Sequence, residues 1–215
     1  MALGNDVAGP SDSKSPRVSV VLPAYNAATQ LPGALASLRA QDENSFEILV
    51  LDDGSEDATW EVLQVHAAGD ARILPIRLVH GGIVPALNKG IERARGRYIA
   101  RMDADDLCAP ERLRRQADYL DTHQDIGLVA CRVGFGGDRD RAGGYAHYVD
   151  WTNTLLSPEA ISLARFQESP LAHPSVMFRK ELCQTLGGYQ DGDFPEDYEL
   201  WLRWMDQGVA MAKLD

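Results

Sequence analysis

Short apolar segments alternate with longer amphipathic segments along most of the chain, and this alternation limits its fold more than any other feature. The apolar segments read as buried strands followed by turn residues; they cover residues 18–22, 46–51, 72–79, 98–102, 126–131 and 173–179. Between them, apolar residues recur at helical spacing, as in the helix predicted over 29–41. Strands that alternate with such helices predict parallel βαβ units. We therefore expect an α/β protein with a Rossmann-like, doubly wound, mainly parallel sheet and helices on both faces.

The domain organisation predicted from this pattern is simple. Residues 1–16 mix Gly, Ser, Pro, Asp and Asn without apolar periodicity, so we expect a disordered lead-in there. Residues 17–215 form a single predicted domain, because the chain is 45% hydrophobic and large enough for one buried core. Within it, Pro75 places the strand over 72–79 at a sheet edge. Further helices are predicted near Pro85, from Pro110, over 158–166 and over 195–204.

The charge and the cysteines exclude several classes of function. A formal net charge of −11 argues against non-specific nucleic-acid binding, which depends on clustered Lys and Arg. The sequence contains no apolar run long enough for a membrane span and no signal-peptide pattern. The three cysteines are odd in number and lack metal-ligand spacing, which favours reduced thiols. We therefore expect a cytoplasmic protein without a transmembrane segment.

Three carboxylates follow the strand over 98–102, at Asp103, Asp105 and Asp106. In extended backbone, residues two apart point the same way about 7 Å apart. Asp103 and Asp105 are then expected to face one divalent cation or one polyol, while Asp106 points elsewhere. A solvated acidic turn before a helix would give the same triplet. Mg²⁺ and Mn²⁺ commonly bind one or two carboxylates together with substrate phosphates, so Asp105 is the candidate ligand.

Other polar residues are predicted to lie at the same edge of the sheet. Tyr25 and Asp53 also follow strands, and ligands of open α/β sheets bind outside the carboxyl ends of the strands. The chain has neither G-x-G-x-x-G nor G-x-x-x-x-G-K-[ST], so a Rossmann dinucleotide loop and a P-loop are not supported. Tyr25 and Asp53 could therefore offer an aromatic face and a carboxylate acceptor to one ligand at this edge.

The second half of the chain adds candidates whose roles the residues leave open. Residues 132–154 are rich in glycine and aromatic residues, including Trp151, and are predicted to be a loop that orders over a ligand, or else a packed insertion. His173 suits either an acceptor site or a buried strand edge. Glu196 and Asp197 suit either stabilisation of a helix dipole or general-base catalysis. Adjacent helical residues point about 100° apart; we expect Asp197 to border the sheet and Glu196 to be rotated away.

Together these residues resemble family 2 glycosyltransferases of the GT-A fold. The resemblance covers about residues 17–206 and rests on five blocks in order, at 18–26, 48–57, 90–114, 173–179 and 187–203. It implies that the pattern containing Pro23 and Tyr25 begins the nucleotide pocket and that Asp53 contacts the base. The implied donor is a nucleotide sugar. A UDP-sugar is favoured, because the Tyr25 ring is suited to stacking on uracil and the Asp53 carboxylate to accepting its N3 hydrogen.

The resemblance also implies the catalytic residues. The family's D-x-D motif matches Asp103-Ala104-Asp105, which implies ribose or metal contact by Asp103 and ligation of Mn²⁺ or Mg²⁺ by Asp105. Glu196-Asp197 precedes an aromatic residue and Leu-x-x-Arg, which implies that Asp197 is the catalytic base of an inverting transfer. His173, Glu196 and Trp151 are the candidates for acceptor or supporting contacts.

The implied function is transfer of one sugar to a carbohydrate or lipid-linked acceptor, in the synthesis of a glycan or a cell-envelope polysaccharide. This function is compatible with peripheral association of the protein at the inner face of the membrane. Processive relatives carry Gln-x-x-Arg-Trp where this chain has Leu200-Trp201-Leu202-Arg203-Trp204, so non-processive transfer is expected. In this family the chain usually continues after this helix with a further strand and a segment that closes over the diphosphate. Here only nine residues follow Asp206, so a truncated domain is expected. A non-catalytic nucleotide-sugar or glycan-binding module and a sugar-nucleotide pyrophosphorylase are the alternatives.

Overall fold

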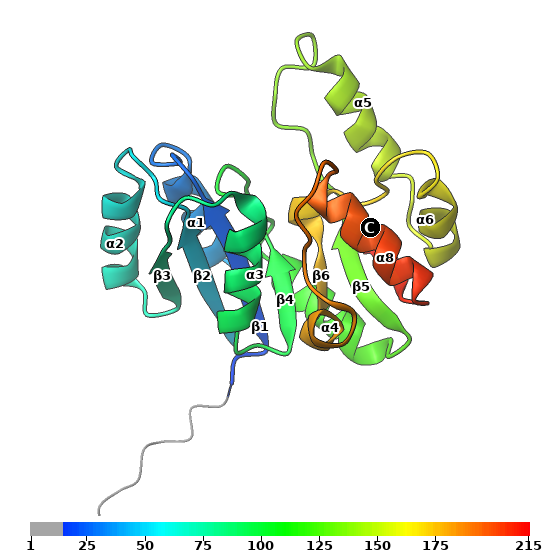
Figure 1. The fold of residues 1–215 in the computed structure, drawn as a ribbon, viewed down its shortest axis with the longest axis horizontal. Helices are drawn as coiled ribbons and strands as arrows, with labels where there is room; N and C mark the ends of the chain where they lie inside the picture. The colour runs from blue at the N-terminus through cyan, green and yellow to red at the C-terminus, as the bar shows by residue number, and fades with distance from the viewer. Residues whose placement is uncertain (1–14) are drawn as a thin grey trace, which may run out of the picture.

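The computed structural model describes residues 15–215, so residues 1–14 of the expected lead-in lie outside it. Its centre is a seven-stranded sheet with the order β3-β2-β1-β4-β6-β5-β7 (Figure 1). The strands are β1 Val18–Ala24, β2 Phe46–Asp52, β3 Ile73–Arg77, β4 Tyr98–Arg101, β5 Ile126–Cys131, β6 Met177–Arg179 and β7 Ala210–Leu214. The helices are α1 Leu31–Arg39, α2 Thr59–Gly69, α3 Ile83–Arg93, α4 Arg112–Thr122, α5 Gly143–Thr152, α6 Pro158–Ala164, α7 Lys180–Leu186 and α8 Glu196–Asp206, with a 3₁₀ turn, η1, at His173–Ser175.

The strand pairing confirms the predicted mainly parallel sheet. β1 pairs in parallel with β2 and β4, β2 pairs with β3, and β5 pairs with β7. β6 is the exception, because it runs antiparallel to both β4 and β5. β3, which contains Pro75, lies at the edge as expected.

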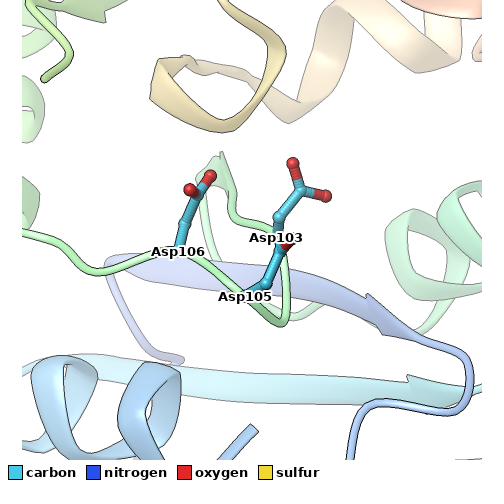
Figure 2. Close-up of side chains that lie close together, drawn as sticks. All are labelled: Asp103, Asp105 and Asp106. Atoms are coloured by element: carbon cyan, nitrogen blue, oxygen red, sulfur yellow. The ribbon is translucent and has the colours of Figure 1, made fainter. Parts of the chain in front are cut away.

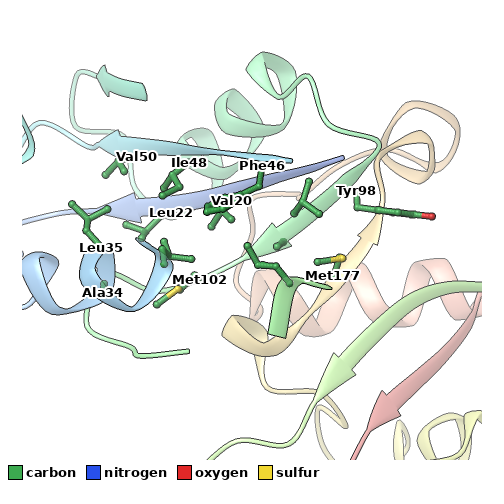
Figure 3. Close-up of a cluster of buried hydrophobic side chains, with 14 of the residues drawn as sticks. Val20, Leu22, Ala34, Leu35, Phe46, Ile48, Val50, Tyr98, Met102 and Met177 are labelled. Carbon is green, nitrogen blue, oxygen red and sulfur yellow. The ribbon is translucent and has the colours of Figure 1, made fainter. Parts of the chain in front are cut away.

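Helices cover both faces of the sheet because successive residues of a buried strand point to opposite sides. Val20 and Val50 belong to a hydrophobic cluster with residues of α1, α2 and α4, part of which Figure 3 shows. Val21 and Leu51 face the other way, into a cluster with residues of α3, α6 and α8. The central strands are therefore buried on both faces, and their polar groups are confined to their ends.

Three elements differ from the sequence-based predictions. The predicted loop over 132–154 contains helix α5, which begins at two glycines and places only Ala146, Val149 and Thr152 in the interior. α7 was not predicted, because it is only seven residues long and its apolar residues Leu182, Cys183 and Leu186 are only partly buried. The segment over 173–179 is not the last strand, since β7 follows α8 and pairs with β5.

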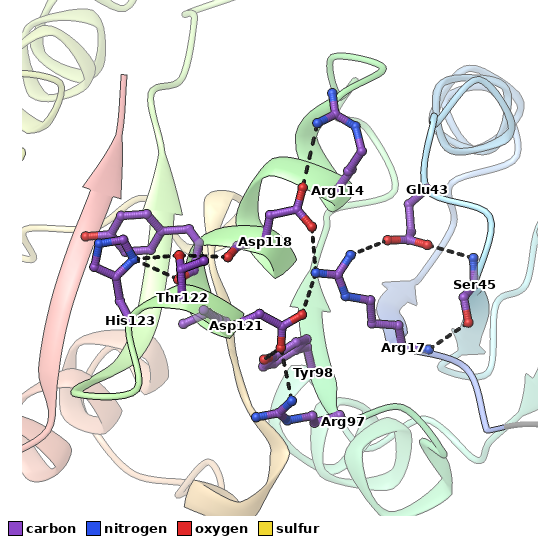
Figure 4. A network of polar contacts seen from close by, with 12 residues as sticks. Arg17, Glu43, Ser45, Arg97, Tyr98, Arg114, Asp118, Asp121, Thr122 and His123 are labelled. Atoms are coloured by element: carbon purple, nitrogen blue, oxygen red, sulfur yellow. Dashed lines mark hydrogen bonds and ion pairs between the residues drawn. The ribbon is translucent and has the colours of Figure 1, made fainter.

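A polar network lies at the amino end of β1. Arg17 forms ion pairs with Glu43 at 2.9 Å, Asp118 at 2.7 Å and Asp121 at 2.6 Å (Figure 4). The hydroxyl of Tyr98 donates to Asp121 at 2.6 Å. These contacts join the start of the sheet to α4 and to the loop before β2. They involve the end of the sheet opposite to the acidic residues that follow β4.

Candidate functional site

The acidic residues after β4 lie in a turn. β4 ends at Arg101, and the amide of Asp106 then donates to the carbonyl of Asp103 at 3.4 Å. Carboxylate oxygens of Asp103, Asp105 and Asp106 all lie within 4.8 Å of one another. Figure 2 shows the Asp103 and Asp106 carboxylates projecting to the same side of the loop. The expectation that Asp106 points elsewhere is wrong, because the chain turns at Ala104 and Asp105.

This cluster combines close negative charges with partial burial. The pKa of Asp106 is raised, first because its carboxyl is buried and then because the Asp103 and Asp105 charges are close. Arg101 offsets part of this charge, since its Nη1 forms an ion pair with Oδ2 of Asp103. The Arg101 side chain is only 3% exposed, and within residues 15–215 its Nε has no hydrogen-bond partner. Arg112 also lies near enough to act on Asp106, so three carboxylates face two guanidiniums. The remaining negative charge is one that a hard divalent cation would neutralise.

Two cavities meet at this cluster. One, of about 710 Å³, is lined by Asp103, Asp105 and Asp106 and extends between α4 and the ends of β5 and β7. The other, of about 410 Å³, is lined by Arg101, Asp103, His173, Glu196 and Asp197 among others. Asp103, Tyr145, Ala172 and Pro174 line both cavities. The acidic turn and the start of α8 therefore border one continuous region, although they are far apart in the sequence.

Glu196 and Asp197 have different environments in the first turn of α8. Nδ1 of His173 lies 3.4 Å from Oε1 of Glu196, and its Nε2 lies 2.8 Å from the hydroxyl oxygen of Tyr189. The His173 contact lowers the pKa of Glu196, whereas burial raises the pKa of Asp197. Both carboxylates line the smaller cavity, so the expectation that Glu196 is rotated away is wrong. Glu196 is thus held by His173, whereas the pKa of Asp197 is shifted in the opposite direction by burial.

The aromatic residues of α5 lie beside both cavities. Tyr145 lines the two of them and is 58% exposed, and Tyr148 lines the smaller one. Their ring centroids are 5.8 Å apart, and the ring of Phe135 lies 5.8 Å from that of Tyr145. Trp151 lies 6.1 Å from Tyr148 but is not among the residues that line either cavity. α5 therefore presents Tyr145 and Tyr148, rather than Trp151, to these spaces.

The residues predicted to bind a nucleotide lie at the ends of β1 and β2. Pro23 is half-buried within β1, and Tyr25 follows that strand and is 46% exposed. The amide of Asp53 donates to the carbonyl of Ala24 at 2.9 Å, which joins the two strand ends. The Asp53 carboxylate accepts hydrogen bonds from the amides of Gly81 and Gly82, each at 2.9 Å. The structure thus brings Tyr25 and Asp53 together as predicted, with the loop after β3 beside them.

Sequence reasoning missed several residues of this site. Arg101 could have been found from the sequence, because it is a charged residue at the end of an apolar strand and a buried charge needs a partner. Tyr145 and Tyr148 were visible as aromatic residues in a glycine-rich segment, but only the helix shows which rings share a face. His80 belongs to no motif, and only the structure reveals its contact with Tyr25.

Comparison with known proteins assigns the chain to a family. The model of the family described as glycosyl transferase family 2 matches residues 19–187. The chain belongs to this family. The amylovoran biosynthesis glycosyltransferase AmsE of Erwinia amylovora is 33% identical over 206 residues, which are 91% of this chain and 72% of the relative. The putative glycosyltransferase EpsE of Bacillus subtilis is 30% identical over 206 residues, covering 91% of this chain and 69% of that protein.

Solved structures confirm the GT-A fold of this family 2 transferase. The mannosyltransferase PcManGT from Pyrobaculum calidifontis, in complex with GDP-Man and Mn²⁺, superposes with a TM-score of 0.71 at 23% identity. S. aureus TarS 1–349, in complex with UDP-GlcNAc, gives a TM-score of 0.72 at 21% identity. The matches cover 97% and 92% of this chain but only 57% and 56% of those chains. Within residues 15–215, the helices are too short or too polar to cross a membrane.

Proposed function

We propose that this family 2 glycosyltransferase is inverting and non-processive, and that it transfers one sugar from a UDP-sugar to a hydroxyl of a glycan or lipid-linked acceptor. The observation that carries the proposal is the pair of adjoining cavities, which places the acidic turn after β4 beside Asp197 of α8. Two relatives are named for a biosynthetic pathway: AmsE for amylovoran biosynthesis, and the putative glycosyltransferase TuaG of Bacillus subtilis for teichuronic acid biosynthesis. Polysaccharide synthesis is therefore the setting that we propose.

The acidic turn suits a divalent metal ion. Its donors are carboxylate oxygens within 4.8 Å of one another, which are the hard ligands that Mg²⁺ and Mn²⁺ prefer. We assign Asp105 as the main ligand, because Asp103 is paired with Arg101 and Asp106 is more buried. When bound, the metal would act as a Lewis acid that stabilises the charge on a leaving diphosphate.

Asp197 is assigned as the general base. Its carboxylate lines the smaller cavity, and one of its oxygens accepts a hydrogen bond from the amide of Tyr198 at 2.8 Å. In the proposed reaction it accepts the proton of the acceptor hydroxyl while that oxygen attacks the anomeric carbon, and the nucleoside diphosphate leaves from the opposite face. One displacement inverts the anomeric configuration. A positioned base contributes about 10²–10⁴-fold to the rate.

The acceptor is proposed to lie along α5. The exposed ring of Tyr145 lies between the acidic turn and Asp197, where it can pack against a sugar ring, and Tyr148 extends this surface into the smaller cavity.

Non-processive transfer is supported by α8, in which Leu200 stands where processive relatives carry Gln. Arg203 of the same segment donates to the carbonyls of Leu186 at 2.5 Å and Gly188 at 2.7 Å. It therefore braces the loop before α8.

Replacement of Asp197 by Asn tests the proposal. The change keeps the size of the side chain and removes the base, so sugar transfer should fall by about 10²-fold or more while metal-dependent UDP affinity stays near that of the wild type. Glu196→Gln is the matched control, and it should retain more transfer than Asp197→Asn. Near-normal transfer by Asp197→Asn would refute the assignment.

The same assays separate the alternatives. Binding of nucleotide sugars without turnover, over a panel of donors and acceptors, would identify a non-catalytic module. Formation of a nucleoside triphosphate from a nucleotide sugar and pyrophosphate would identify a pyrophosphorylase. A retained anomeric configuration in the product, followed by NMR, would exclude the single-displacement mechanism.

A further inference from the structure

The imidazole of His80 lies against the two residues that are proposed to hold the nucleotide base. Its ring stacks on the ring of Tyr25, with centroids 4.3 Å apart and planes inclined by 24°. Its Nδ1 lies 2.9 Å from Oδ2 of Asp53 and 3.0 Å from the Asp53 carbonyl oxygen. Both of these oxygens are acceptors, so Nδ1 carries the hydrogen.

These contacts match those expected of uracil. A uracil ring would stack on Tyr25 and donate its N3 hydrogen to the Asp53 carboxylate; the imidazole stacks on the same ring and donates to the same carboxylate. We propose that His80 occupies the position of the base in the nucleotide-free protein and is a specificity-determining residue, because a base must reproduce both contacts to displace it. This inference rests on the proposed function, since it concerns the donor site of that reaction.

The backbone around His80 is fixed, so displacement requires only a side-chain rotation. Gly54 has a φ of 69°, and a Cβ atom on it would lie 2.7 Å from the backbone nitrogen of His80. A side chain at position 54 would therefore push this segment away. The amides of Gly81 and Gly82 anchor the next two residues to Asp53. The His80 side chain, in contrast, is 57% exposed and can turn into solvent.

When the His80 side chain rotates away, the Asp53 carboxylate can accept one more hydrogen bond. Oδ1 accepts from Gly81, and Oδ2 accepts from both Gly82 and His80. A carboxylate oxygen has two lone pairs, so the departure of the imidazole frees one acceptor direction on Oδ2. A base with a ring N–H can use it. Cytosine has the same ring size as uracil but an acceptor at N3, which would face the Asp53 carboxylate unfavourably.

The first test compares UDP and CDP in the presence of Mn²⁺ by isothermal titration calorimetry. UDP should bind the wild type better than CDP and better than UDP methylated at N3, which lacks the hydrogen. His80→Ala removes the competing contact, so the affinity for UDP should rise by about tenfold, the ratio that corresponds to about 1.4 kcal/mol. In a Tyr25→Leu background the same change should give a smaller gain, because the stacking partner is absent.

The second test observes His80 directly by NMR of its ring protons. Stacking on Tyr25 should shift these signals upfield, and Tyr25→Leu or saturation with UDP should remove the shift. His123 stacks on Tyr119 with centroids 4.0 Å apart and is the internal control, since neither change should move its signals.

The outcomes separate this inference from the proposed function. If the wild type binds UDP while the His80 signals stay unchanged, or if His80→Ala leaves UDP affinity the same or weakens it, the displacement of His80 is wrong and the donor site stands. If neither the wild type nor His80→Ala binds UDP with Mn²⁺, the proposed donor site fails together with the inference.

Discussion

The buried amine of Lys213 should make the stability of the protein rise with pH. Lys213 lies in β7 and is only 6% exposed. Its Nζ donates to the carbonyl of Thr152, at the end of α5, and to the carbonyl of Pro170 at 3.3 Å. Burial lowers the pKa of this amine from 10.5 to about 8. One side chain thus connects the last strand to α5 and to the segment that leads to His173.

The size of this change in stability follows from the linkage between protonation of Lys213 and folding. Between pH 8 and 10.5 the unfolded chain keeps the proton on Lys213 while the folded protein loses it, so the free energy of unfolding increases with pH. A pKa lowered from 10.5 to about 8 corresponds to about 3 kcal/mol. Below pH 8 both states carry the charge, and the folded state bears the full cost of burying it.

Urea denaturation of the wild type and Lys213→Met across pH 7 to 10.5 measures this effect. Met keeps much of the side-chain volume without the amine, so the stability difference should change by about 3 kcal/mol in favour of the wild type as the pH rises. Other titrating groups largely cancel in the difference. Lys89→Met is the control for the loss of a lysine outside the buried core, because Lys89 pairs with Glu92 on α3. A flat difference for Lys213→Met would refute the reasoning and show that the amine stays charged in the folded protein.

Three further predictions concern the site. Asp105→Ala should weaken UDP binding and abolish its dependence on Mn²⁺; an unchanged titration would contradict the metal assignment. Tyr145→Ala should raise the acceptor KM by about tenfold, which corresponds to a loss of about 1.4 kcal/mol in acceptor binding, and should leave donor affinity unchanged. Tyr145→Phe should retain function. Phe166→Ala serves as the control, because Phe166 is exposed and lines neither cavity. Equal effects of Ala and Phe at position 145 would contradict ring packing. Arg203→Met should lower the free energy of unfolding by about 1–3 kcal/mol in denaturant titrations, because it leaves loop carbonyls unpaired; a loss below 0.5 kcal/mol would contradict its bracing role.

The sheet could be predicted because its signal is local. Val50 and Leu51 lie in an apolar run with helices on either side, and such runs at regular intervals imply a doubly wound sheet before any contact is known. Asp105 and Asp197 could be chosen as candidates for a related reason, since each lies next to an element with a clear pattern. The sequence order of strands and helices therefore predicts which edge of the sheet carries the acids.

The remaining features depend on contacts that the local pattern does not contain. The position of Asp106 follows from a turn whose geometry three acidic residues do not specify. The face of α5 that bears Tyr145 depends on packing against segments far away in the chain. His80 lies in a loop with no periodicity, and its stacking on Tyr25 arises only because β1 and β3 flank the same neighbour, β2.

The strand order also determines which parts of the sheet can pair early, while the chain is still being translated. β3, β2, β1 and β4 are adjacent in the sheet and all end by residue 101, so Tyr25, Asp53, His80 and, directly after β4, Asp105 leave the ribosome as one early group. β5 pairs with β6 on one side, but its other side must wait for β7, as Val129 pairs with Ala212 near the end of the chain. Pairing between such distant segments is slow compared with local structure formation. Cellular nucleotide that binds the early strands would stabilise them by mass action before the helix carrying Asp197 has been synthesised.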